Sequence, residues 1–362
     1  MAEQHHVKIP AHYNIYSGNS GRELRIEFSI PSEEINHKTG LLLLVPGFGG
    51  NIDSRVYKKM RETFADQFNL IVIQCDYFGS SYMQSADSIN FSNLATLEEL
   101  LTSDEIKQVN ANQSQLWSIL STKSAILPVK AKLNESINDF NDMGYMQAID
   151  LITSIEIVKA IVKDNGYSFD EKRIIGYGHS HGAYLLHLSN CLSPHLFSYL
   201  IDNSAWIEPS YMKQNRILYQ QVGMLTLAVE FEYLAKEIID NKSYLNLENL
   251  YKNYNGSAQI ISFQGDEDNL IDHIEKERII SSIPRAEFSL ITKEKVDQIR
   301  FKSNNHGLDA DFLELFSWAL EMEKPLTLIE EIPLNYEVNI GSLHIEVNSS
   351  GGLPIFHFQE SK

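Results

Sequence analysis

Residues 173–186 constrain the fold of this chain more than any other segment, because they join a buried strand to a helix through a serine. At their centre, residues 178–182 read Gly-His-Ser-His-Gly, after two isoleucines and before a run rich in alanine and leucine. In a nucleophile elbow the serine occupies a strained turn between strand and helix, with its hydroxyl exposed at the top of the sheet. Gly178 and Gly182 supply the small residues that this close turn needs. The segment therefore predicts an elbow with Ser180 as the nucleophile.

Apolar runs of strand length recur on both sides of the elbow and predict a mostly parallel sheet. Residues 41–45, 69–76 and 259–263 are almost continuously apolar, which is typical of strands buried on both faces. A helix beginning near Asp53 or Ser54 joins the first two and makes a βαβ unit. Further strands are expected over residues 24–30, 197–201 and 287–291, and further helices over 144–163, 272–281 and 311–320. We therefore expect an α/β fold with a doubly wound sheet and helices on both faces.

Two segments interrupt this alternation and predict insertions. Residues 79–138 are polar and irregular, with a helix expected over 103–120, and residues 206–256 are rich in aromatic residues, with a helical run over 225–239. Near the end of the chain, residues 336–340 and 343–347 alternate around Gly-Ser and predict a β-hairpin. The expected organisation is one domain over residues 1–322, with cap or lid insertions at 79–138 and 206–256. A C-terminal β extension over 323–362 would pack on it.

A nucleophilic serine needs a base within hydrogen-bond reach, and the base needs an acid that orients it. In doubly wound hydrolases these groups follow the serine in the order acid, then histidine. Asp268 lies on a turn directly after residues 259–263, so it is the expected acid, with Asp266 and Asp202 as alternatives. His306 precedes the last expected helix and is the expected base.

The oxyanion of an acyl-transfer intermediate needs preorganised N–H donors. We expect them from the backbone of His181, next after the serine, and of Phe48, in a glycine-rich loop after residues 41–45. Further pocket candidates are the flanking glycines and two polar residues: Gly47, Gly49, His179 and Asp202. His179 and His181 lack an evident third ligand, so no metal is expected. The loop carries no phosphate-binding motif, so no cofactor is expected either.

The charge balance restricts the partners. A formal net charge of -18 argues against a nucleic-acid partner, because phosphate contacts need clustered Lys and Arg. The two cysteines, Cys75 and Cys191, lie in apolar surroundings and are expected to be buried free thiols. The first eight residues show no signal peptide and no run is long enough to span a bilayer, so we expect a cytoplasmic protein without a membrane span.

Several of these segments together resemble the α/β-hydrolases. Residues 46–50, Pro-Gly-Phe-Gly-Gly, are similar to the HGFGG-like loop of those proteins, with proline in place of histidine. A closer resemblance is to an uncharacterised α/β-hydrolase-like family found in flagellin-glycosylation gene clusters of motile bacteria. It rests on residues 46–51, 143–150, 201–204 and 301–307 and on the elbow, which departs from the Gly-Gly-Ser-Tyr-Gly-Gly form of many members. The resemblance implies the fold and the triad, and no established substrate.

The expected function is that of an esterase-like serine hydrolase. It would cleave an ester or acyl bond through an acyl-enzyme, and its substrate would be a small molecule or a glycan carrying an acyl ester. One alternative is an acyltransferase with a sugar or protein acceptor. The other is a non-catalytic binding or assembly module related to surface glycosylation, because a fold can host new functions.

Overall fold

The structure, a computed structural model, describes residues 1–325 and 333–360. The chain forms two compact units. The main unit comprises residues 1–80, 142–210 and 239–362, and the inserted unit comprises residues 81–141 and 211–238. Residues 326–332 and 361–362 of the expected C-terminal extension lie outside the described residues.

An eight-stranded sheet forms the centre of the main unit, in the order β1-β2-β4-β3-β7-β8-β11-β12. The strands are β1 (Glu3–Pro10), β2 (Glu23–Ile30), β3 (Gly40–Val45), β4 (Leu70–Cys75), β7 (Ile174–His179), β8 (Tyr199–Asn203), β11 (Gln259–Gly265) and β12 (Ala286–Ile291). β1 and β2 pair antiparallel, and the six strands from β4 to β12 are parallel. β3, β4 and β11 are buried along their whole length, which explains their continuous apolar runs.

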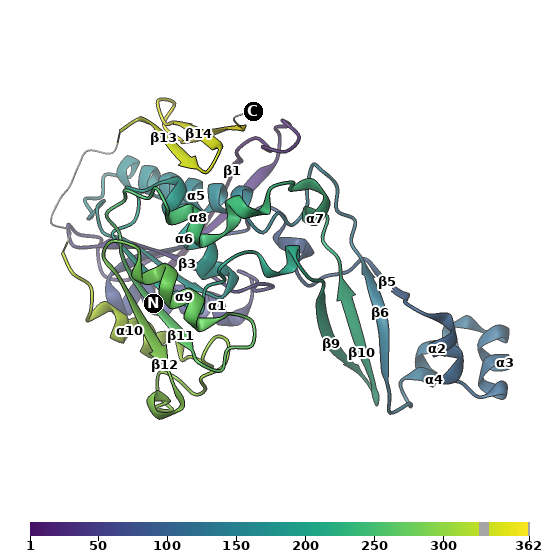
Figure 1. The fold of residues 1–362 in the computed structure, drawn as a ribbon. Coiled ribbons are helices and arrows are strands. Elements are labelled where there is room, and N and C mark those ends of the chain that lie inside the picture. The colour runs from purple at the N-terminus through teal and green to yellow at the C-terminus, as the bar shows by residue number, and fades with distance from the viewer. Residues whose placement is uncertain (326–332, 361–362) are drawn as a thin grey trace. The chain divides into compact units, whose positions relative to one another are not determined.

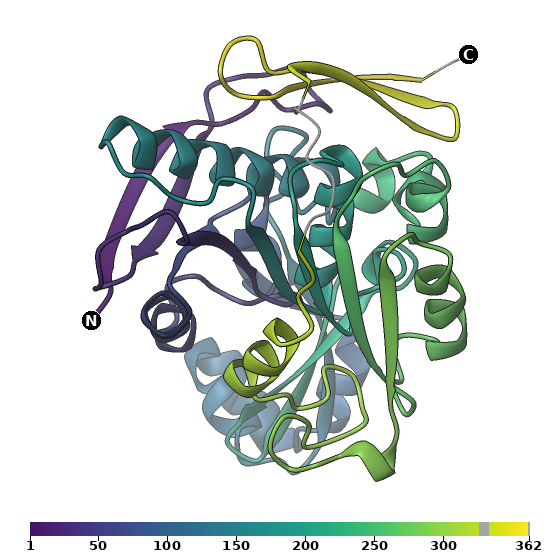
Figure 2. The same cartoon turned by 90° about the vertical axis from the view of Figure 1, so that its left-hand side faces the viewer.

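Helices cover both faces of this sheet, as expected (Figure 2). On one face lie α1 (Arg55–Phe68) and α10 (Phe312–Leu320), where the rings of Phe64 and Phe316 stack 4.8 Å apart. On the other face lie α5 (Tyr145–Asp164) and α6 (His181–Leu192). Every residue of α6 is buried, so the helix is packed on all sides and its first residue, His181, is held in place.

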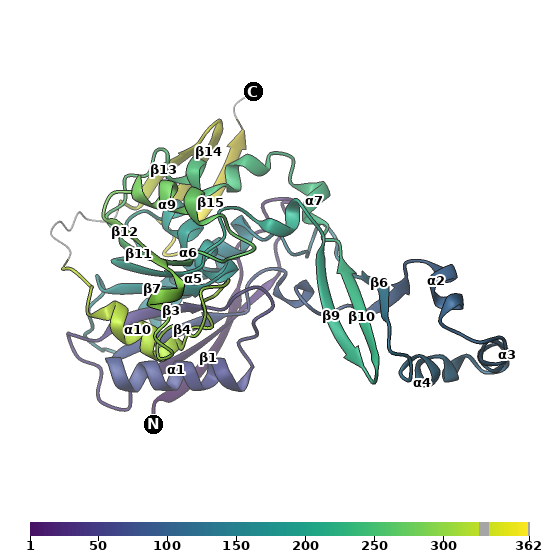
Figure 3. The ribbon, with the colours of Figure 1, turned by 60° about the horizontal axis from the view of Figure 1, so that its bottom comes forward.

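The inserted unit contains a four-stranded sheet in the order β5-β6-β10-β9 (Figures 1 and 3). Its elements are β5 (Ser88–Phe91), β6 (Ile126–Lys132), β9 (Arg216–Val222) and β10 (Leu225–Phe231), with α2 (Leu94–Glu99), α3 (Ser103–Ala111), α4 (Leu116–Leu120) and α7 (Ala235–Ile238). The predicted helix over 225–239 is wrong for residues 225–231, which form β10 with alternating buried and half-buried residues, and is confirmed only in the short α7. The helix predicted over 103–120 is broken at Asn112, whose backbone is extended.

Residues 239–256, expected in the second insertion, belong to the main unit and contain α8 (Leu247–Tyr251). The predicted C-terminal hairpin is confirmed by β13 (Asn335–Ile340) and β14 (Leu343–Asn348), which pair antiparallel. A third strand, β15 (Ile355–Glu360), was not expected and pairs with β14. Tyr13 donates a 2.7 Å hydrogen bond to the carbonyl of Phe356 and ties this small sheet to the N-terminal segment.

A buried carboxyl ahead of α5 provides a pH-dependent contribution to stability. Asp142 accepts hydrogen bonds from the backbone N–H of Met146 (2.7 Å) and the hydroxyl of Tyr16 (3.0 Å). Burial nevertheless raises the pKa of Asp142 to about 6. The folded state therefore binds this proton more tightly than the unfolded chain does. This contribution is present at pH 4 and is lost as the pH rises through 6.

We expect Asp142 to lower the free energy of unfolding by about 2 kcal/mol between pH 4 and pH 7. Urea unfolding of the wild type and of Asp142→Asn across this range isolates the effect, because the amide does not titrate. The difference between the two proteins should change by this amount. A difference that stays constant with pH contradicts the prediction.

Candidate active site

Ser180 occupies the turn between β7 and α6 and has backbone angles that few residues adopt. Its φ is 54° and its ψ is -122°, a strained combination for a residue with a side chain. The residue is 6% exposed, and its backbone N–H donates to the carbonyl of Asn203 at 2.8 Å. This is the geometry of the elbow that residues 178–182 predict.

The two glycines of the elbow are required by backbone crowding. A Cβ on Gly178 would lie 2.5 Å from the backbone nitrogen of Ala183, and one on Gly182 would lie 2.3 Å from the carbonyl oxygen of Pro46. Both neighbours are backbone atoms, which cannot rotate away. The elbow can therefore close only if these positions lack a side chain.

Gly182→Ala is accordingly expected to lower the free energy of unfolding by at least about 2 kcal/mol, because it overpacks backbone against backbone. Chemical denaturation measures the loss. Gly351→Ala is the matched control, since a Cβ there meets nothing within 4 Å. Equal stability of the two variants would show that the elbow tolerates the extra methyl group.

A hydrogen-bond relay starts at the serine. The Oγ of Ser180 lies 2.7 Å from Nε2 of His306, and Nδ1 of His306 lies 2.7 Å from Oδ2 of Asp268. An ionised carboxylate only accepts, so Nδ1 carries the proton and Nε2 is left to accept from the serine hydroxyl. The structure thus brings together the three residues that the sequence selected as nucleophile, base and acid.

The surroundings of Asp268 keep its carboxyl ionised. Its side chain is fully buried, which by itself raises the pKa. The hydrogen bond from His306 outweighs burial, helped by the backbone N–H groups of Leu270 (2.8 Å) and Ile271 (3.0 Å), so the pKa of Asp268 is lowered. The side chain of Gln264 donates a further hydrogen bond of 2.6 Å. The carboxylate is therefore held in one orientation toward His306.

Neither alternative acid is hydrogen-bonded to His306 in the described part of the chain. Asp266 accepts a 2.7 Å hydrogen bond from Asn304. Asp202 is 2% exposed, and its carboxylate lies in a separate buried cluster with His187 and Lys276. These partners hold the side chain of Asp202 inside the fold.

Two short polar segments, outside the elbow, connect the loops that carry the triad residues. Asn304 accepts from the backbone N–H of Glu267 at 3.1 Å, and a Cβ on Gly265 would lie 2.1 Å from its carbonyl oxygen. Ser204 accepts from the N–H of Gly307 at 3.1 Å. The two segments are residues 201–204 and 301–307, which are among those that carry the family resemblance. Their signal is a polar run directly at a strand end or ahead of a helix.

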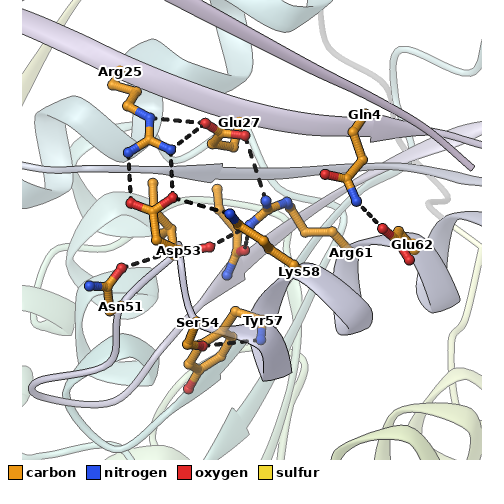
Figure 4. Close-up of polar contacts among 12 residues, drawn as sticks. Gln4, Arg25, Glu27, Asn51, Asp53, Ser54, Tyr57, Lys58, Arg61 and Glu62 are labelled. Carbon is orange, nitrogen blue, oxygen red and sulfur yellow. Dashed lines mark hydrogen bonds and ion pairs between the residues drawn. The ribbon is translucent and has the colours of Figure 1, made fainter.

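The loop after β3, which carries Phe48, is anchored by ion pairs (Figure 4). Arg25 makes two 2.7 Å hydrogen bonds to Asp53, and Arg61 donates at 3.0 Å to the carbonyl of Ile52. Of the two expected caps, Ser54 is the N-cap of α1, and its side chain accepts from the backbone N–H of Tyr57 at 3.3 Å. The loop is thereby fixed at its helical end.

Of the two histidines beside the serine, His181 is buried and His179 is half-buried, and both rings are neutral. His179 lies between two loops: a Cβ on Gly47 would be 2.7 Å from its Nδ1, and one on Gly307 would be 2.4 Å from its Nε2. Burial lowers the pKa of His179 to about 4 and that of His181 to about 3. The ring of His181 lies 4.7 Å from that of Trp206 and 5.2 Å from that of Phe48, so it packs between aromatic side chains.

Residues 1–325 and 333–360 also show the state of the cysteines, the arrangement of metal-binding side chains and the character of the helices. Cys75 and Cys191 are both buried and free, as predicted. No group of three His, Cys, Asp or Glu side chains in these ranges is arranged to hold a metal ion. None of their helices is both long enough and apolar enough to cross a membrane.

A family model described as "Protein of unknown function (DUF2920)" matches residues 18–238. The chain belongs to this family. The DUF2920 match includes the elbow and the Phe48 loop and ends before Asp268 and His306. No curated protein matches the chain.

Solved structures place this DUF2920 member in a known fold. An acylaminoacyl peptidase in complex with Z-Gly-Gly-Phe-chloromethyl ketone aligns over 91% of this chain and 43% of its own, with 14% identity and a TM-score of 0.51. The acylaminoacyl peptidase of Pyrococcus horikoshii aligns over 91% and 42%, with 16% identity and a TM-score of 0.50. The chain thus spans less than half the length of either peptidase. The likeness confirms the α/β-hydrolase fold that the sequence predicts.

Proposed function

We propose that this protein is a serine hydrolase that cleaves an ester or related acyl bond. The observation that supports it best is the relay from Ser180 through His306 to Asp268, with both hydrogen bonds at 2.7 Å. All three residues follow carboxyl ends of parallel strands, which is where open α/β sheets place their ligands.

In this proposal His306 accepts the proton of Ser180 as its Oγ attacks the acyl carbonyl. Asp268 holds the imidazole in the required tautomer and stabilises the imidazolium that forms. The backbone N–H groups of Phe48 and His181 donate to the oxyanion, and His181 begins α6, where the helix dipole favours negative charge. His306 then gives its proton to the leaving alcohol, and water releases the acyl group by the same steps in reverse order.

The proposed steps restrict the class of substrate. They need an activated acyl carbonyl and neither a metal nor a cofactor. We propose an oxygen ester of a small molecule or a glycan, since an ester carbonyl is more electrophilic than an amide carbonyl and an alcohol leaves with less help from a general acid than an amide nitrogen does. The acylaminoacyl peptidases of the same fold make amides the natural comparison in a substrate screen. A cap or lid role for the inserted unit, and the association with flagellin glycosylation, stay predictions.

Labelling with a fluorophosphonate tests the proposal. Mass spectrometry of the labelled protein should find one adduct, on the peptide that contains Ser180. A panel of short acyl esters and matching amides should then show turnover of the esters. A wild-type protein that neither labels nor hydrolyses any member of the panel would contradict the proposed function.

A further inference from the structure

A buried ion pair lies close to the relay and takes no part in the proposed steps. Lys276, on α9 (His273–Ser281), is 0% exposed and lies 2.9 Å from the carboxylate of Asp202 at the end of β8. Burying two charges costs much of what their attraction returns, so such a pair is weak evidence of stabilisation. The backbone that this ion pair holds in place gives a better reason for its presence in the fold.

Both charged groups bind the same backbone residue. Oδ1 of Asp202 accepts from the N–H of Ala205 at 2.7 Å, and Nζ of Lys276 donates to the carbonyl of Ala205 at 2.7 Å. The other carboxylate oxygen accepts from Ser262 at 2.7 Å and lies 3.0 Å from Nε2 of His187. Both oxygens of Asp202 and the ammonium of Lys276 are hydrogen-bonded, so the pair fixes Ala205 relative to β8, β11 and α9.

The turn between Asp202 and Ala205 is bonded to both halves of the reaction centre. The carbonyl of Asn203 accepts from the N–H of Ser180 at 2.8 Å. The hydroxyl of Ser204 accepts from the N–H of Gly307 at 3.1 Å, and the amide of Asn203 donates to the carbonyl of Gly307 at 3.3 Å. Ser204 has a φ of 57°, so the turn keeps a conformation that its surroundings have to impose. One turn thus connects the nucleophile to the residue beside the base.

We propose that Lys276 and Asp202 are positioning residues, which hold Ala205 so that the Asn203–Ser204 turn sets the spacing of Ser180 and His306. The expected effect of these two residues on reaction rate rests on the proposed function. Their expected effect on the geometry of the site rests on the contacts alone. It assigns a role to two buried charged residues on different elements that touch no reacting atom.

Lys276→Met tests the effect on rate. The second-order rate constant for fluorophosphonate labelling of the folded variant should fall about 100-fold, because a displacement of about 1 Å at a reaction centre has that effect. In ester turnover the loss should appear in kcat, with KM little changed. Arg22→Met is the matched control, since Arg22 forms a 2.6 Å pair with the buried Asp150 in the same unit. It should label within a few-fold of the wild type.

A second variant separates positioning from folding. Lys276→Met leaves a buried charge without its partner, so Asp202→Asn/Lys276→Met removes both charges together. The double variant keeps an acceptor for the N–H of Ala205 and lacks the donor to its carbonyl. We expect it to be more stable than Lys276→Met and still to label at least ten-fold more slowly than the wild type. A folded double variant that labels at the wild-type rate would overturn the inference.

Proton NMR supplies a readout that needs no catalysis. The Nδ1 proton of His306, in its 2.7 Å hydrogen bond to Asp268, should give a low-field resonance that His306→Asn removes. We expect this resonance to be lost or broadened in Lys276→Met and kept in Arg22→Met. Its persistence in Lys276→Met refutes the positioning role. If the wild type does not label, the proposed function fails, while the NMR comparison still decides the inference.

Discussion

Ser180→Ala is expected to abolish fluorophosphonate labelling and to lower ester hydrolysis by about 10⁴-fold or more. The substitution removes the only atom in the relay that forms a bond to the acyl carbon, and a methyl side chain replaces hydroxymethyl without adding volume. Steady-state hydrolysis of the best ester and active-site titration measure the loss. Substrate binding should persist, because the change removes only the hydroxyl.

Ser189→Ala is the matched control for this experiment. Ser189 is also a buried serine, on the same helix α6, and its hydroxyl bonds only weakly, at 3.4 Å, to the carbonyl of Ala148. The control should keep wild-type labelling and turnover. If Ser180→Ala hydrolyses the ester as fast as Ser189→Ala does, Ser180 is not the nucleophile and the proposed mechanism is wrong.

The central sheet was predictable because its signal is local. β3, β4 and β11 are continuously apolar, and any strand buried on both faces has to be so. The inserted unit differs, because its strands are fixed by distant partners. β10 pairs with β6, about a hundred residues earlier, through contacts such as Val229 with Val129. Leu225 to Ile239 contains alanine, leucine and glutamate, which also suit a helix, so only the pairing decides its structure.

The sequence predicted the site residues as far as their order after successive strands could select them. Ser180 has an elbow sequence, and the expected chain order then selects an acid and a histidine. Asp268, on a turn directly after a strand, was the expected acid, and Asp202, near the end of β8, stayed an alternative. The difference comes from Lys276, on a helix far along the chain, which claims the first carboxylate and leaves the second to His306. Such a long-range pairing has no sequence signal.

Asp268→Asn is expected to lower kcat of ester hydrolysis by about 10³- to 10⁴-fold, with little loss of stability. The amide can donate to Nδ1, which favours the imidazole tautomer with its proton on Nε2, and that tautomer cannot accept from Ser180. Because His306 and two backbone N–H groups lower the pKa of Asp268, the wild-type carboxylate is ionised at neutral pH, and the variant removes that charge. Steady-state kinetics with the same ester gives the magnitude.

Asp266→Asn is the matched control, since this carboxyl lies two residues away on the same turn and bonds to Asn304 instead of His306. We expect it to lose less than about ten-fold, because the amide oxygen can still accept from Asn304. A larger loss for Asp266→Asn than for Asp268→Asn would exchange the roles of the two carboxyls. Wild-type turnover in both variants would leave His306 without an orienting acid, and Ser180 would then need another explanation for its reactivity.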